Sequence, residues 1–142
     1  MDDRAENNSL PSGNHFSDHV LVMLFKFNSY FPIRSLNLMR GVLVAEEDNF
    51  KSYYIDNIFD AIWQDGLNMN DDNIILKVLK NLNINPKTFA LRATSSSIKD
   101  SLKKRTAEAY EKGIFGAPTF VSNNKLFWGQ DRIEFVLKEA SK

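Results

Sequence analysis

The sequence contains no cysteine among its 142 residues. This absence excludes thiol nucleophiles, disulfide bridges and cysteine-based metal sites. Long apolar runs are missing too: the longest near the N-terminus, Val20 to Phe25, is far shorter than the roughly 20 residues that span a bilayer. The residues before this run are acidic and no small-residue cleavage site follows it, which argues against a signal peptide. We therefore expect a cytoplasmic protein that does not enter the membrane.

An excess of charge of either sign is also lacking. Lys and Arg together number 18, as do Asp and Glu, so the formal net charge is zero. Because nucleic-acid-binding domains are usually basic, we expect no nucleic-acid partner. His15 and His19 lie four residues apart and could bind a metal from one helix face. Gly13 and the polar residues around them favour solvated histidines instead, and we expect no metal site.

The chain has the length of one ordinary domain, and its pattern divides it into three parts. Residues 1–24 are polar and are expected to form a poorly ordered tail, although Val20 to Phe27 could form a short strand. Residues 25–113 show helical periodicity, and residues 114–142 predict a β-hairpin followed by a helix. We therefore expect an α+β protein that is mostly helical.

Five helices are expected between residues 35 and 113, each beginning at a residue that can cap an N-terminus. The second has apolar residues nearly all round, which is typical of a helix buried on more than one side. In the fifth, Tyr110 is expected to face the core. The expected caps are Ser35, Asp48 or Asn49, Asn70 or Asp71, Asn85 before Pro86, and Ser95.

The stretch GAPTFVSNNKLFWGQDR, Gly116 to Arg132, predicts a hairpin that turns at Ser122-Asn123-Asn124 and leads into a last helix. Pro118 is unusual before a strand because it cannot donate to the sheet. A cis bond here would turn the preceding backbone outward, where it could pair with an extended peptide. The following helix N-terminus suits a carboxylate, and Asp131 suits an ammonium. The alternative is a plain turn proline with Asp131 stabilising only its own helix, and spacing leaves both open.

A longer stretch, GIFGAPTFVSNNKLFWGQDR, resembles the C-terminal part of the 2-hydroxychromene-2-carboxylate isomerases and kappa-class glutathione transferases. These families have a thioredoxin-like fold with an inserted helical domain, within a superfamily that includes the bacterial disulfide oxidoreductases. FKFNSYFPIRSLNLMRG and FDAIWQDGLNMND are similar to two further family segments. The resemblance runs from about Phe25 to Lys142. It implies an inserted helical domain plus the C-terminal β-β-α half of a thioredoxin-like fold.

The same resemblance implies a glutathione-dependent isomerase or transferase that acts on a small aromatic or conjugated substrate. Phe31, with Asn28 and Tyr30, would border the substrate. The residues implied to bind glutathione are Ala117, through its backbone beside the cis-proline Pro118; Trp128 and Gly129, which would shape the pocket; and Gln130 and Asp131, which would contact the γ-glutamyl end.

The family's first strand, its catalytic serine and its second strand have no counterpart in the 24 residues before Phe25. We therefore assign a catalytic role to none of Ser9, Ser12 and Ser17, and expect a truncated form of the isomerase. Two alternatives stay open: a non-catalytic relative that acts as a binding or packing module, and a portion of a longer gene product. A hairpin without its usual neighbours would have a free edge, through which we expect association or a homodimer.

Overall fold

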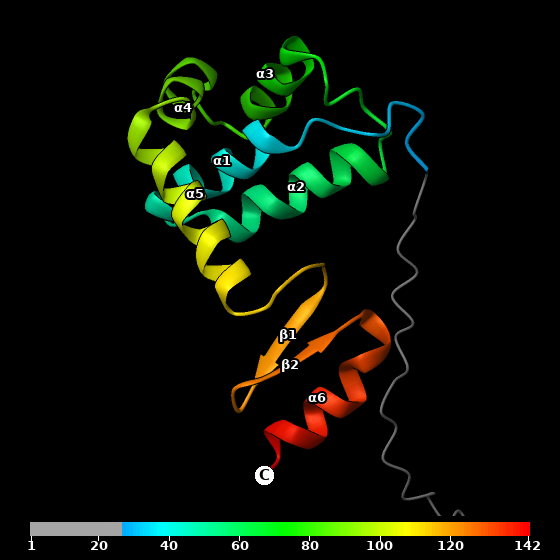
Figure 1. The fold of residues 1–142 in the computed structure, drawn as a ribbon. Coiled ribbons are helices and arrows are strands. Elements are labelled where there is room, and N and C mark those ends of the chain that lie inside the picture. Colours follow the sequence, from blue (N-terminus) through cyan, green and yellow to red (C-terminus); the bar gives the residue numbers. More distant parts are fainter. Residues whose placement is uncertain (1–26) are drawn as a thin grey trace, which may run out of the picture.

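The structure, a computed structural model, describes residues 27–142 (Figure 1). The predicted tail, the two histidines and the apolar run Val20 to Phe25 lie outside these residues. The elements are, in chain order, α1 (Leu36–Glu47), α2 (Lys51–Trp63), α3 (Asp72–Asn81), α4 (Pro86–Ala93), α5 (Ser96–Glu111), β1 (Thr119–Ser122), β2 (Lys125–Trp128), the 3₁₀ turn η1 (Gln130–Arg132) and α6 (Ile133–Ala140).

Helices α1 to α5 pack around one hydrophobic core. Helix α1 lies at the centre of this group and contacts α2, α4 and α5, while α3 packs on α4 (Figure 1). Among the described residues, all buried hydrophobic side chains lie between Leu38 and Ile98. The burial of apolar surface that drives folding is therefore concentrated in the helical part. None of the helices within residues 27–142 has the length and apolar content needed to cross a membrane.

Three of the predicted helix caps are confirmed. Side-chain oxygens accept hydrogen bonds from first-turn backbone N–H groups: Asp71 from Asn73 at 2.8 Å, Asn85 from Thr88 at 3.2 Å, and Ser95 from Ile98 at 3.4 Å. Each bond satisfies a donor that a helix otherwise leaves unpaired. Ser35 occupies the cap position of α1, but its side chain makes no capping bond.

The predicted cap of α2 at Asp48 or Asn49 is wrong. Asn49 has a φ of 63° and serves to end α1. The next N–H, that of Phe50, donates to the Ala45 carbonyl at 2.9 Å, which completes the end of α1. Phe50 then precedes the first residue of α2, Lys51, without a side-chain cap. Asparagine favours both the start of a helix and a left-handed end, so the short connection misled the prediction.

Burial of the helix faces also differs from the predictions. Helix α2 is buried along one face only, because Tyr53 and Phe59 are exposed. Tyr110 of α5 was expected to point inward, yet it is 80% exposed. Ile133 and Leu137, four residues apart on α6, are exposed as well. These apolar residues have helical spacing, but the described chain offers no element to cover them.

The hairpin β1–β2 is antiparallel, with Thr119 opposite Trp128 and Ser122 opposite Lys125. Asn123 and Asn124 form the turn with φ values of 47° and 60°, as type I′ hairpin turns require. Helix α6 packs on both strands, and this unit follows α5 at a distance from the other helices (Figure 1). The sheet has two strands, so both outer edges are unpaired within the described chain. Association through these edges stays a prediction.

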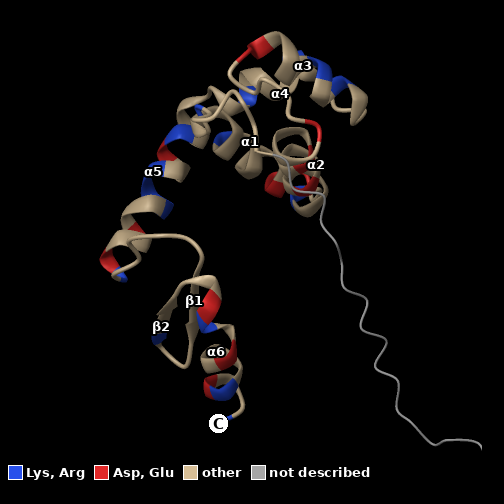
Figure 2. Ribbon diagram, turned by 90° about the vertical axis from the view of Figure 1, so that its right-hand side faces the viewer, with Lys and Arg blue, Asp and Glu red and all other residues tan. Residues whose placement is uncertain are grey.

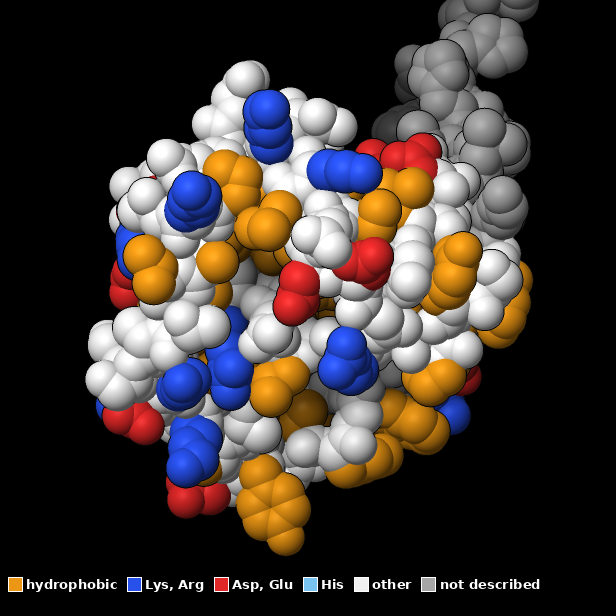
Figure 3. Space-filling model, turned by 90° about the horizontal axis from the view of Figure 1, so that it is seen from above, with side chains coloured by type: hydrophobic (Ala, Val, Ile, Leu, Met, Phe, Trp, Pro, Cys, Tyr) orange, Lys and Arg blue, Asp and Glu red, His pale blue; other side chains and the backbone are white. Residues whose placement is uncertain are grey.

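Charged residues are interspersed rather than gathered by sign. Along α5, basic and acidic positions lie close together in the ribbon of Figure 2. The face seen from above likewise mixes hydrophobic, basic and acidic side chains (Figure 3). Several basic residues of the described chain are paired with acids, as Arg92 is with Glu47 at 2.7 Å. This mixed surface agrees with the zero net charge of the sequence.

Glu139 fastens the end of α6 to the hairpin. Its two carboxylate oxygens accept hydrogen bonds from Lys125 at 2.8 Å and Lys142 at 2.7 Å. Its backbone carbonyl accepts a third from the Asn123 side chain at 2.8 Å. The two lysine hydrogen bonds lower the pKa of the Glu139 carboxyl from 4.5 to about 2. Protonation of this carboxyl therefore weakens the attachment.

We expect the attachment of α6 to be pH-dependent. Because the folded-state pKa lies below the unfolded value, the stabilisation is complete above pH 4.5 and is lost as the pH falls toward 2. Glu139→Gln should flatten this dependence, as followed by NMR of the hairpin amides. Glu134→Gln, which removes an exposed acid in the first turn of the same helix, is the control and should leave the pH dependence unchanged. If the hairpin amide signals of wild type and Glu139→Gln changed with pH in the same way, this role of Glu139 would be contradicted.

Candidate functional site

The residues predicted to hold glutathione lie on two segments that flank the hairpin. The first segment follows α5, which ends before Gly113, and runs to Pro118 at the start of β1. The Ala117–Pro118 peptide bond is cis. Thr119 donates its hydroxyl to the Gly116 carbonyl at 2.5 Å, which fixes the turn before the strand. The second segment runs from Trp128, the last residue of β2, through η1.

A backbone hydrogen bond joins these two segments. The N–H of Gly129 donates to the Pro118 carbonyl at 2.9 Å, one step beyond the paired residues Thr119 and Trp128. This bond extends the hairpin ladder to its open end. The structure therefore brings Pro118 next to Gly129 and joins the segment that contains Ala117 to the segment that contains Gln130 and Asp131.

Ala117 presents its backbone to solvent. The residue is exposed, and neither its N–H nor its carbonyl makes a hydrogen bond to any residue within 27–142. A backbone segment with both groups unpaired can accept an extended peptide alongside it. Asp131 is also exposed, and its nearest cation is the neighbouring Arg132, whose Nε lies 3.5 Å from one carboxylate oxygen. The arrangement thus offers a peptide donor, a peptide acceptor and a carboxylate on adjacent segments.

Gly129 shapes the turn between β2 and η1. Its φ of 107° lies in a region that residues with a side chain rarely adopt. A Cβ at this position would also collide with a carboxylate oxygen of Asp131. Any other residue would thus strain the backbone and displace Asp131 from its position. The glycine was assigned to the site from the family resemblance, and these geometric reasons emerge only from the structure.

Trp128 forms one wall beside the same segments. Its ring packs on Phe115, with ring centroids 5.1 Å apart. A Cβ on Gly116 would lie 2.6 Å from the indole Nε1, so only glycine permits the indole to lie this close. About half of the Trp128 side chain stays exposed. Phe115 and Gly116 were not among the predicted site residues, although they stand in the same sequence stretch.

Asn28, predicted to border the substrate, lies fully buried. Its amide nitrogen donates to the Ile62 and Leu67 carbonyls, both at 2.9 Å, and its oxygen accepts from the Tyr30 N–H at 2.8 Å. The side chain therefore ties the segment before α1 to the end of α2. Asn28 therefore positions the Tyr30 backbone and is not itself exposed. Direct contact between Asn28 and a substrate stays a prediction.

Asn70 also binds the segment before α1 through its side chain, a role that the sequence analysis did not predict. Its side-chain amide donates to the Tyr30 carbonyl at 3.1 Å, and its oxygen accepts from the Arg34 N–H at 2.8 Å. Asn70 belongs to the stretch FDAIWQDGLNMND, and Asn28 to FKFNSYFP. Two segments singled out separately by the family resemblance are therefore in contact, and together they fix the backbone of residues 28–34.

Phe31 belongs to an exposed aromatic cluster. Its ring lies 6.0 Å from that of Phe27 and 6.0 Å from that of Trp63, both in tilted geometry. It also lines a small apolar cavity of about 260 Å³ between α1 and α2. Tyr30 is about half exposed beside it. These rings offer a surface for a flat apolar molecule.

The two sets of predicted residues are not joined in the structure. Within residues 27–142, no hydrogen bond, ion pair or ring contact links Tyr30 or Phe31 to the segments around Ala117 and Asp131. The same range holds no group of three or more His, Asp or Glu side chains placed to bind a metal ion.

Comparison with known proteins identifies the family to which this fold belongs. Residues 19–140, most of the chain, match the sequence pattern of the DSBA-like thioredoxin domain. The chain belongs to that family. It is also similar to 2-hydroxychromene-2-carboxylate isomerases: 26% identical over 114 residues to that of Pseudomonas putida, covering 80% of this chain and 55% of the relative. It is 24% identical over 96 residues to the isomerase of Sphingobium xenophagum, and this match covers 68% of this chain and 49% of the relative.

A solved structure of a 2-hydroxychromene-2-carboxylate isomerase superposes with a TM-score of 0.66 at 23% identity, covering 76% of this chain and 53% of that one. This likeness confirms the predicted α+β fold, mostly helical and DsbA-like. The resemblance to the isomerases is confirmed as well. The chain spans about half the length of the curated relatives it matches.

Proposed function

We propose that this chain is a glutathione-dependent protein of the 2-hydroxychromene-2-carboxylate isomerase type, and that the segments around Ala117 and Asp131 hold glutathione. Similarity to proteins named as these isomerases supports the reaction class. The observation that carries the proposal is the hydrogen bond from Gly129 to Pro118, because it joins the segment that contains the unpaired backbone of Ala117 to the segment that leads to Asp131.

The groups around Ala117 fit the chemistry of glutathione. This tripeptide carries a cysteinyl N–H and carbonyl, an α-ammonium and two carboxylates. The unpaired N–H and carbonyl of Ala117 complement the cysteinyl unit in the manner of strand addition. The exposed Asp131 carboxylate complements the ammonium by a charge-assisted hydrogen bond. The Trp128 ring would cover one side of the peptide and exclude water from it.

When bound, glutathione supplies a thiol that can add reversibly to a conjugated double bond. This chain's residues would contribute binding and orientation: Ala117 fixes the cysteinyl unit, and Asp131 fixes the other end. Tyr30 and Phe31 would offer an aromatic surface to a small conjugated substrate. We assign no catalytic residue among the described residues.

Asp131→Ala should weaken glutathione binding by about tenfold or more, since a hydrogen bond to a charged group contributes about 1.5–3 kcal/mol. Isothermal titration of the full chain with reduced glutathione measures this. Glu134→Ala, which removes an exposed acid of α6 one turn away, is the matched control and should bind as wild type does. Ala117→Pro, which removes the backbone donor, should weaken binding as well. Equal affinity in all four proteins would overturn the assignment.

A second function is a non-catalytic binding or packing module. The concentration of buried hydrophobic residues between Leu38 and Ile98 favours it, because the helical part then needs no further element for its core. Isomerase turnover by the purified chain separates the two. Turnover above the buffer rate supports the enzyme, whereas binding without turnover supports a binding module. If the chain does not bind glutathione even at millimolar concentration, the result supports a packing module.

A further inference from the structure

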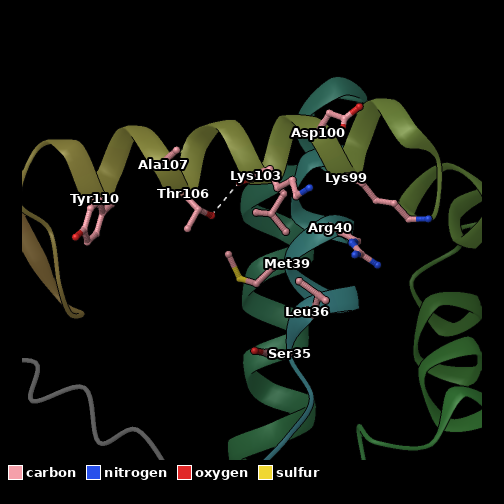
Figure 4. A pocket seen from close by; sticks show the side chains of 11 residues that line it. Ser35, Leu36, Met39, Arg40, Lys99, Asp100, Lys103, Thr106, Ala107 and Tyr110 are labelled. Atoms are coloured by element: carbon pink, nitrogen blue, oxygen red, sulfur yellow. Dashed lines mark hydrogen bonds between the residues drawn. The ribbon is translucent and has the colours of Figure 1, made fainter.

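A groove of about 910 Å³ runs between the first half of α1 and the length of α5. It is separate from the glutathione segments, which lie on the hairpin beyond the end of α5 (Figure 1). Its volume falls within the range of small-molecule sites. The close view in Figure 4 shows side chains of both helices lining it.

The apolar side chains that line the groove are unusually exposed. Leu36 and Met39 of α1 and Tyr110 of α5 line it, and all three are about half exposed or more. Figure 4 shows Tyr110 at one end of α5, with Leu36 and Met39 below the helix toward its middle. Exposed apolar side chains that share a groove are typical of a binding surface.

The part of the groove away from Tyr110 also contains basic side chains. Arg40, Lys99 and Lys103 line it, and within residues 27–142 none of the three has a carboxylate partner. This contrasts with their neighbours on α5, since Lys104 pairs with Glu108 and Arg105 with Glu46. Lys99 and Lys103 are four residues apart, so their like charges repel each other on one helix face.

The guanidinium of Arg40 is incompletely paired. One terminal nitrogen donates to Asn37 at 3.0 Å, but the buried Nε has no hydrogen-bond partner in the structure. A carboxylate bound at the terminal nitrogens of this guanidinium would add to the single hydrogen bond that they make with Asn37. Asp100 also lines the groove, yet its carboxylate points to the opposite side of α5 from the heads of Arg40 and Lys99 (Figure 4).

We propose that the α1–α5 groove binds a linear amphipathic carboxylate, such as a medium-chain fatty acid. The carboxylate lies at Arg40, Lys99 and Lys103, and the acyl chain runs over Met39 and Leu36 toward Tyr110. The axial rise of α5 from Lys99 to Tyr110 is about 16 Å, which suits an extended chain better than a compact ring. The unpaired cations select an acidic head over a neutral or basic one. This site goes beyond the proposed function.

Decanoate is the probe, added to the full chain labelled with ¹³C at the methionine methyl groups. Met39 lies in the groove, whereas Met69 is fully buried and serves as an internal reference. We expect a saturable shift of the Met39 signal with decanoate and none with acetate. Decyltrimethylammonium, which has the same chain and a cationic head, should bind at least fivefold more weakly.

A pair of matched variants tests the basic side chains. Lys99→Gln with Lys103→Gln should weaken decanoate binding about fivefold, because two exposed ion pairs are lost. Lys77→Gln with Lys80→Gln removes the same charge from exposed positions of α3 and should leave binding unchanged. The proposal is overturned if Met39 does not shift, if both detergent heads bind equally, or if the two double variants behave alike.

Discussion

Gly41→Leu is expected to unfold the helical part of the protein. Gly41 is a buried residue of α1, and a Cβ there would lie 2.7 Å from Cζ of Tyr54 and would collide with its hydroxyl. The ring of Phe89 lies 3.1 Å away on another side. Larger side chains at such a position force their neighbours out of place, at about 1–3 kcal/mol or more. Urea denaturation followed by circular dichroism measures the loss.

Tyr54 cannot move aside easily. It is 1% exposed, its ring centroid is 5.4 Å from that of Phe89, and its hydroxyl donates to the Leu38 carbonyl at 3.2 Å. Burial raises the pKa of this phenol, which keeps the donor protonated. Any shift of the ring therefore breaks a buried hydrogen bond as well as apolar packing.

Two further variants isolate the contact. Ser52→Leu introduces the same side chain at an exposed position of α2 and should cost little. The smaller substitution Gly41→Ala combined with Tyr54→Phe should be less destabilising than the sum of the two single changes, because the hydroxyl that the new methyl group meets is gone. Wild-type stability of Gly41→Leu, or strict additivity of the pair, would show that the packing is looser than described.

The features that the sequence predicted correctly depend on neighbours close in the chain. The caps at Asp71, Asn85 and Ser95 involve a residue and a backbone N–H two or three positions later. The hairpin turn depends on the tolerance of Asn123 and Asn124 for positive φ. Such signals are complete within a few residues, so no tertiary context is needed to interpret them.

The features that the sequence missed depend on distant partners. Tyr110 and Leu137 have the spacing of buried residues, but whether they are covered depends on which elements lie against α5 and α6. Asn28 finds its acceptors 34 and 39 residues away, at the end of α2 and in the loop after it. Periodicity predicts which residues share a face, and only packing decides what that face meets.

In the candidate site, too, the sequence identified residues in one local stretch, whereas their geometry depends on tertiary contacts. Ala117, Gly129 and Asp131 were identified in one continuous stretch by resemblance, and the structure adds the hydrogen bond from Gly129 to Pro118 that joins their two segments. The contact of Gly116 with Trp128 lies in that stretch too, but it depends on how the indole folds back over the turn. No pattern in the residue types predicts that geometry.

Asn28→Leu is expected to destabilise the protein by about 3 kcal/mol or more. The change leaves the Ile62 and Leu67 carbonyls and the Tyr30 N–H without their partner. The bond to Ile62 is buried and the other two are partly buried, and an unsatisfied buried group costs about 1–3 kcal/mol. Asn73→Leu is the control, because that side chain is exposed on α3. Urea denaturation of both variants gives the comparison.

Asn28→Asp separates hydrogen bonding from side-chain size. The carboxylate can still accept from Tyr30, but it cannot donate to the two carbonyls and it places a charge at a fully buried position. Burial should raise the pKa of the new carboxyl, so the loss of stability should grow as the pH rises through and above 4. If Asn28 instead faced a substrate, both variants would fold with wild-type stability and only substrate binding would change. A stability loss that tracks the charge therefore identifies Asn28 as the residue that positions Tyr30 and Phe31.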